Sequence, residues 1–246
     1  MNARSQDDIQ GLKAAGAAVR DAFDTMIAAC KPGITTGELD RLGHDVLTAH
    51  GARSAPQLYY EFPGATCISI NEHAAHGIPG DRVVQDGDMI NIDVSANLAG
   101  YVADMGQSFV VGQGSQAQQD ICRAVQDAVE AALAKVKSGR SLNVIGKAVQ
   151  QIADARGYSI VRNLGSHGVG RNIHEEPSYI PYDNPSEDRK LERGMVITIE
   201  PFFSTGVEWV EEEADGWTLS VPPGNLVAQY EHTLIVTDNG ALVVTR

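Results

Sequence analysis

Two acidic residues interrupt segments that otherwise have the composition of buried β-strands, and they constrain the fold more than any other feature. Glu200 follows the apolar run Met195–Ile199, and Glu231 lies inside the largely apolar segment 226–237. Burying a carboxylate without a partner is energetically costly, so each side chain needs a cation or a hydrogen-bonding partner. For either acid alone, a salt bridge to Arg or Lys, or a strand face that stays in water, is the simpler explanation.

A second pair of acids belongs to a predicted β-hairpin. Residues 89–111 are expected to form two strands joined by the turn-forming stretch 97–100. Asp93 then faces Asp104 directly, with the two Cβ atoms about 5 Å apart, whereas a slip of one residue would place them on opposite faces. Facing carboxylates repel each other, and basic residues are scarce near all four acids. Together the acids favour a metal site over four separate salt bridges.

A glycine-rich stretch contains a further candidate ligand. His167 lies within residues 165–170, where missing side chains let the backbone and a ligand approach closely. These glycines lack both the Lys–Ser/Thr pair of a phosphate-binding loop and the spacing of a dinucleotide-binding fold. His174 follows in the next segment. His73 and His76 have a spacing that resembles a metal pair; we interpret His73 as a solvated loop residue and leave His76 open.

The order of predicted elements is repeated along the chain. Apolar residues at three- and four-residue steps predict four amphipathic helices, beginning near Ile9, Thr36, Ser115 and Ile145. Each pair of helices is followed by strand-rich sequence. This order predicts an α+β fold of two related halves, roughly residues 1–112 and 113–246.

Charge and cysteine content narrow the class of protein. The chain has 32 acidic and 19 basic residues, a formal net charge of −13, which argues against direct binding to nucleic acid or an anionic membrane. Cys30, Cys67 and Cys122 are widely spaced, which predicts free thiols in a reducing compartment. No apolar run reaches the ~18 residues that span a bilayer, and the polar start does not resemble a signal peptide. We expect a cytoplasmic protein.

Several motifs, in order and spacing, resemble those of the type I methionine aminopeptidases over essentially the whole chain. They are Cys67–Glu72 with His76–Pro79, Asn91–Val94, His167–Gly170, Thr198–Pro201 and Gln229–Thr233. The resemblance implies the pita-bread form of the α+β fold, two pseudo-symmetric halves around a dinuclear metal site. It also implies that residues 1–246 form a single catalytic domain, expected to be monomeric.

The resemblance implies removal of the initiator methionine from nascent polypeptides with a small second residue, through a hydroxide that bridges two metals. Two divalent ions, Co, Mn, Fe or Zn, would be held by Asp93, Asp104, His167, Glu200 and Glu231. Glu200 would also move a proton to the departing amine. His174 would donate a hydrogen bond to the scissile carbonyl, and His76 would contact the peptide backbone beyond it.

The resemblance further implies an apolar pocket for the methionine side chain. Its lining would consist of Tyr59, Phe62, Cys67, Ile173, Phe202 and Trp217, with core packing an equal alternative for Ile173 and Phe202. Ser166 replaces a glycine of many relatives, Ala75 replaces a cysteine of some, and Tyr60 lies in a segment that follows one branch of the family rather than another. Segment 208–226, basic in some relatives that approach the ribosome, is acidic here, so we do not expect ribosome docking through it.

Two other functions remain open on the sequence alone. Aminopeptidase P and prolidase-like enzymes share the five-ligand scheme but usually carry an additional N-terminal domain, and cleavage of X-Pro would identify one. A non-catalytic pita-bread module that binds peptides would typically have lost ligands, whereas none is lost here. Two tightly held metal ions per chain would exclude such a module.

Overall fold

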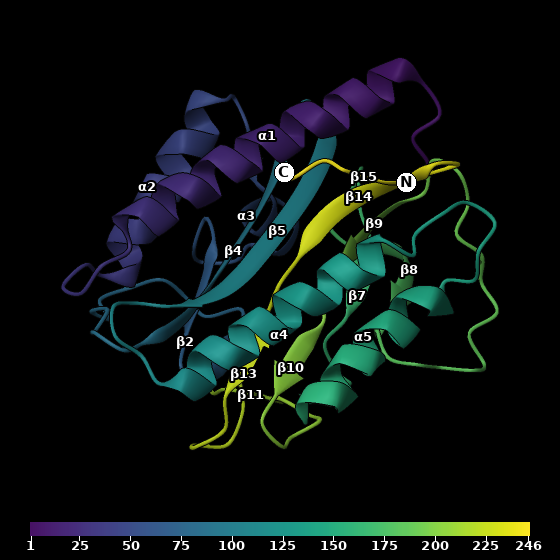
Figure 1. Cartoon of the computed structure of the whole chain (residues 1–246). Helices are drawn as coiled ribbons and strands as arrows, with labels where there is room; N and C mark the ends of the chain where they lie inside the picture. The colour runs from purple at the N-terminus through teal and green to yellow at the C-terminus, as the bar shows by residue number, and fades with distance from the viewer.

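The computed structural model describes residues 1–246, which form five helices and four antiparallel β-sheets. The helices are α1 (Gln6–Ala29), α2 (Thr36–Ala49), α3 (Ala55–Tyr60), α4 (Gln116–Leu133) and α5 (Asn143–Arg156). In Figure 1, α1 lies with α2 and α4 lies with α5, with the long strands β5 (Tyr101–Val110) and β14 (His232–Thr237) between the two pairs. The four long helices confirm those predicted from the apolar periodicity, whereas the short α3 was not predicted.

The strands divide between the two helix pairs. The first sheet has the order β1 (Arg53–Ser54), β4 (Met89–Leu98), β2 (Cys67–Ile70), with β5 also paired to β4. The largest sheet has the order β15 (Gly240–Val243), β14, β9 (Val196–Ile199), β7 (Ser166–Gly168), β8 (Glu175–Tyr179). The small sheets are β13 (Val227–Gln229), β10 (Phe202–Ser204), β6 (Ser159–Ile160), and β11 (Glu211–Glu212), β12 (Leu219–Ser220), β3 (His73–Ala75).

Capping boxes begin three of the long helices, and they explain why helix starts could be predicted. At the start of α2, the Thr35 side chain accepts a hydrogen bond from the Glu38 backbone, and the Glu38 carboxylate accepts one from Thr35. The cap is therefore Thr35, and Thr36 is the first residue of the helix. The Thr36 hydroxyl instead bonds to the backbone of Gly80, which ties α2 to the loop before β4.

The β4–β5 hairpin differs from its predicted register by two residues. The turn consists of Ala99 and Gly100 alone, both with positive φ, as a tight two-residue hairpin turn requires. Asp93 consequently pairs with Gly106, so it is a diagonal neighbour of Asp104 and does not lie directly opposite it. A shift of two residues preserves the face of each side chain, so the prediction that the two acids share a face survives the error.

The predicted strand 226–237 is interrupted in the structure. β13 pairs with β10, and β14 pairs with β9, so the chain changes sheets at Tyr230 and Glu231. At this point Tyr230 forms an isolated bridge with Gln107 of β5, and the Glu231 N–H donates to the Gly106 carbonyl. The break brings Glu231 against the first hairpin.

Two large hydrophobic cores account for most of the buried apolar side chains. One lies beneath α1 and α2 and includes Leu12, Phe23 and Ile92; the other lies beneath α4 and α5. Some side chains of the second half of the chain, including Val169 and Ile173, pack in the first core. No helix is long and apolar enough to cross a membrane.

Candidate metal centre

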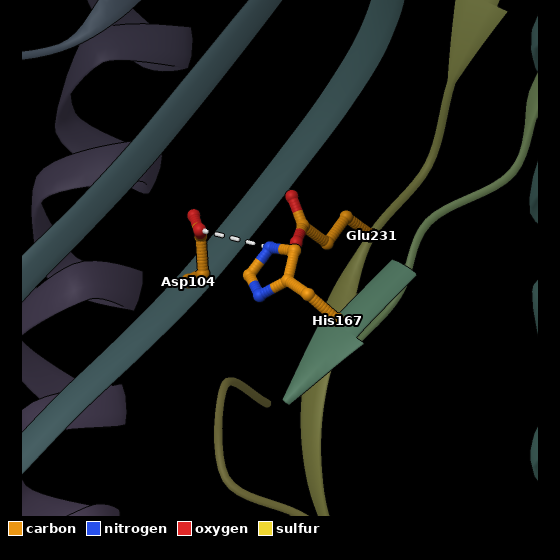
Figure 2. Close-up of side chains that lie close together, drawn as sticks. All are labelled: Asp104, His167 and Glu231. Atoms are coloured by element: carbon orange, nitrogen blue, oxygen red, sulfur yellow. Dashed lines mark ion pairs between the residues drawn. The ribbon is translucent and has the colours of Figure 1, made fainter. Parts of the chain in front are cut away.

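The five candidate metal ligands come from different strands or from positions beside strand ends, but they converge between the two helix pairs. Asp93 lies in β4, Asp104 in β5, His167 in β7, Glu200 directly after β9, and Glu231 between β13 and β14. Ligand atoms of Asp104, His167 and Glu231 all lie within 4.8 Å of one another. Figure 2 shows these three side chains directed toward a common space from separate segments of the chain.

The orientation of His167 leaves one ring nitrogen facing the acids. Its Nδ1 lies 2.9 Å from the carbonyl oxygen of Gly168 and can donate to it. Its Nε2 lies 3.0 Å from Glu200 Oε1 and 3.9 Å from Asp104 Oδ2. An Nδ1–H held by a backbone carbonyl leaves the Nε2 lone pair free, which is the usual arrangement of a metal-binding histidine.

The acids are buried, or half-buried for Asp93, with no Arg or Lys side chain to balance their charge. No Arg or Lys pairs with any of these carboxylates, and Asp104 Oδ1 and Glu231 Oε1 have no hydrogen-bond partner. Burial, together with the neighbouring carboxylates, raises the pKa of Asp93 to about 6 and those of Asp104 and Glu231 well above their usual range. A cluster of four carboxylates and one imidazole, with buried oxygen atoms left unpaired, fits divalent metal ions.

Gln229 also contacts the cluster, although the sequence did not single it out as a candidate site residue. It is buried, and its side-chain Nε2 lies 3.2–3.3 Å from carboxylate oxygens of Asp93, Glu200 and Glu231. Its Oε1 accepts a hydrogen bond of 2.7 Å from Asn91, which fixes the amide so that the NH2 group faces the acids. Gln229 lies two residues before Glu231 in a strand-like segment, and this spacing could have indicated that the two side chains share a face.

Gly106 provides the space for the Gln229 amide, so we expect Gly106→Ala to destabilise the protein by about 2 kcal/mol through overpacking. A Cβ at this position would come within 2.4 Å of Gln229 Oε1. Gly80→Ala is the matched control, because a Cβ there meets no atom within 4 Å. Denaturant unfolding of the two variants measures the difference. Equal stabilities would show that the Gln229 amide is not held tightly.

Two neighbouring hydroxyl groups hold Glu200 in place. The Thr198 hydroxyl lies 3.1 Å from Glu200 Oε1 and accepts from the His167 backbone N–H. The Ser166 hydroxyl accepts a hydrogen bond of 3.0 Å from the Glu200 backbone N–H. The serine that departs from the family pattern therefore fixes the backbone of a candidate ligand, a contact that glycine cannot make.

A cavity of about 270 Å³ opens onto the cluster. Its lining combines candidate ligands with apolar side chains: Pro56, Tyr60, Phe62, Cys67, His76, Asp93, Ser95, Asp104, His167, Ile173, His174, Glu200 and Trp217. Phe62 and Trp217 meet edge to face, with ring centroids 5.2 Å apart. The apolar part of the lining therefore includes an aromatic pair in edge-to-face contact, which suits an apolar ligand group.

Tyr59 and Phe202, both expected in the lining, lie outside it. The Tyr59 hydroxyl donates to the carbonyl of Arg171 at 2.9 Å and accepts from Asn97, so its side chain supports the loop before His174. Phe202 packs in a small apolar cluster with Val161 and other residues of β10 and its neighbours. The other expected lining residues, Phe62, Cys67, Ile173 and Trp217, do reach the cavity.

The two remaining candidate histidines also lie at the cavity. Burial lowers the pKa of His76, and burial together with nearby His167 lowers that of His174 to about 4, so His174 is neutral at neutral pH. The His174 ring meets the His167 ring edge to face at 4.4 Å between centroids. Its Nδ1 lies 2.6 Å from the Tyr60 hydroxyl. His73 stays apart from the cluster at the strand β3, where it is half-buried.

Comparison with known proteins places this arrangement in a family. The model of metallopeptidase family M24 matches residues 10–238. A methionine aminopeptidase of Staphylococcus epidermidis is 45% identical, with 100% of this chain and 99% of the relative covered, and one of Escherichia coli is 39% identical, with 98% and 92% covered.

The fold agrees with the same family. The crystal structure of a methionine aminopeptidase from Rickettsia prowazekii covers 100% of both chains with a TM-score of 0.95 and 34% sequence identity. The predicted pita-bread form of the α+β fold is thereby confirmed. The chain belongs to metallopeptidase family M24 and, within it, to the type I methionine aminopeptidases.

Proposed function

We propose that this protein removes the N-terminal methionine from new polypeptides with a small second residue, in a reaction that depends on divalent metal ions. The observation that carries the proposal is that one cavity contains both a candidate metal centre and an apolar wall. One wall holds the buried carboxylate–imidazole cluster, and the other holds apolar side chains including Phe62 and Trp217. The relatives that match the whole chain bear the same activity in their names.

We assign the metal to the five converging side chains. Asp93, Asp104, His167, Glu200 and Glu231 would hold two ions, of Co, Mn, Fe or Zn, since one nitrogen and many oxygen donors discriminate weakly among them. When bound, such ions supply Lewis acidity that polarises a peptide carbonyl and acidifies water. Both halves of the chain contribute ligands, which supports one catalytic domain over residues 1–246. We propose that this domain acts as a monomer in the cytoplasm, where new chains are made.

The protein's own groups divide the remaining work. The Glu200 carboxylate, anchored through Thr198, accepts a proton and passes it to the departing amine. Neutral His174 donates a hydrogen bond to the scissile carbonyl oxygen, where negative charge develops. His76, at the same cavity, contacts the peptide backbone beyond the cleaved bond.

We expect Phe62→Ala to raise KM for Met-Ala-Ser about tenfold, because it removes an aromatic wall from the methionine pocket. Phe109→Ala is the matched control: Phe109 packs against the first core and does not line the cavity. Steady-state kinetics of both variants test the assignment. If the KM values of the two variants rise equally, Phe62 does not contact the methionine side chain.

Peptide specificity tests the proposed function itself. Metal-loaded protein should release methionine from Met-Ala-Ser, and should release little from a peptide with a bulky second residue. X-Pro peptides without an N-terminal methionine serve as the test for prolidase-like activity. Cleavage of those peptides with no release of methionine would reject the proposal in favour of the prolidase-like alternative.

The acidic segment 208–226 includes the exposed strand β11, where Glu211 and Glu212 face solvent. We propose that this surface does not dock on ribosomal RNA, since its charge has the wrong sign. The peptide substrate would then reach the cavity without ribosome docking through this segment.

A further inference from the structure

Tyr60 has an unusual position for a half-exposed aromatic residue. It is the last residue of α3 and remains 45% exposed, yet it lines the cavity. Its hydroxyl lies 2.6 Å from His174 Nδ1, and the two ring centroids are 5.4 Å apart. The next residue, Glu61, has a φ of 59°, in the left-handed region, so the chain reverses there and Phe62 also reaches the cavity.

The hydrogen bond constrains the protonation of the imidazole. Burial raises the pKa of Tyr60, so the phenol keeps its proton and can donate to Nδ1. A neutral imidazole carries one N–H; when Nδ1 accepts, that hydrogen is on Nε2. The structure shows no other hydrogen bond to the His174 ring. Tyr60 is therefore the one polar group of the chain in contact with the ring, and because a phenol donates more readily than it accepts, the contact favours the tautomer with the hydrogen on Nε2.

We propose that Tyr60 is a positioning residue that holds His174 in the Nε2–H tautomer, so that Nε2 can donate to the carbonyl oxygen of the substrate. This inference rests on the proposed function, because it assigns a substrate contact to His174. It gives a specific contact to a residue in the segment that follows one branch of the family. The phenol acts through the imidazole and does not itself touch the substrate carbonyl.

A double-mutant cycle separates this role from a direct contact between Tyr60 and the peptide. With metal-loaded enzyme and Met-Ala-Ser, Tyr60→Phe should lower kcat about fivefold with little change in KM, as expected for loss of one hydrogen bond. His174→Ala should lower kcat about 100-fold. Tyr60→Phe should then have no further effect in the His174→Ala background. Tyr158→Phe is the control. The Tyr158 hydroxyl makes no hydrogen bond, and its ring stacks on Phe203.

A spectroscopic measurement tests the same point without turnover. Nitrogen-15 NMR of zinc-loaded protein should show His174 with its proton on Nε2, and Tyr60→Phe should produce exchange between tautomers. An Nδ1–H tautomer in the wild type would overturn the inference, as would an equal effect of Tyr60→Phe with and without His174. If wild-type protein releases no methionine, the proposed function fails, but the tautomer measurement still decides whether Tyr60 orients His174.

Discussion

Glu200→Gln should abolish methionine release while leaving the fold intact. Gln has nearly the same shape, so packing around the site is preserved, but it carries no charge and cannot accept the proton that the departing amine needs. It also replaces one candidate ligand oxygen with an NH2 group. The combined loss should lower kcat by at least about 1,000-fold.

The measurement pairs activity on Met-Ala-Ser with circular dichroism and metal content of the same sample. Glu208→Gln is the control, because Glu208 is exposed and pairs only with Arg162, so its loss should leave kcat unchanged. If Glu200→Gln keeps metal but has no activity, the proton-transfer role is supported; if it loses metal, the ligand role is. A variant that retains more than a tenth of wild-type activity would contradict both roles.

Metal removal should destabilise the protein, and the effect should grow as the pH rises. Without metal, Asp93, Asp104 and Glu231 have pKa values above their usual range, because they are buried beside one another. The folded state then binds protons more tightly than the unfolded state. This stabilisation is complete below the unfolded-state pKa values and is lost as the pH rises through the folded-state values.

For Asp93, a pKa raised from 3.8 to about 6 corresponds to about 3 kcal/mol lost across that range. In a protein of this size that is on the order of 5–10 °C in Tm. The metal-loaded form behaves in the opposite way, because ions bind the deprotonated carboxylates and must displace protons at low pH.

Thermal unfolding of loaded and chelator-stripped protein at pH 5 and pH 7.5 tests this prediction. The difference in Tm between the two forms is the quantity to compare, since groups remote from the cluster titrate equally in both. His232, with a pKa lowered by burial to about 3, loses its stabilisation as the pH falls. A difference that stays constant or shrinks as the pH rises would contradict a metal at the acids.

The candidate ligands could be predicted from the sequence because acidic residues are unusual in segments with the composition of buried strands. Glu200 and Glu231 stand out in apolar strands, and nothing in the local sequence could neutralise them. The prediction for the hairpin placed Asp93 and Asp104 on the same face, which is correct, but it gave the wrong register. The turn consists of Ala99 and Gly100 and is tighter than expected. Asn or Gly at position 99 would have indicated a positive φ, whereas Ala gives no such signal.

Other parts of the site depend on tertiary contacts that no local pattern reveals. Gln229 reads as an ordinary polar residue until the sheets bring three carboxylates around its amide. The Tyr60–His174 contact joins residues 114 positions apart, through a helix too short for periodicity to detect. Tyr59 was expected in the pocket, but its hydroxyl binds the Arg171 carbonyl instead.

The most direct test of the account is reconstitution of one protein sample. Protein stripped of metal should release no methionine from Met-Ala-Ser, and titration with Mn, Fe, Co or Zn should restore release in step with metal bound at the cluster. Asp104→Asn, which removes a buried ligand charge without changing size, should bind metal weakly and remain inactive across the same titration. Full methionine release from metal-free protein, or from Asp104→Asn with no metal bound, would contradict the central claim.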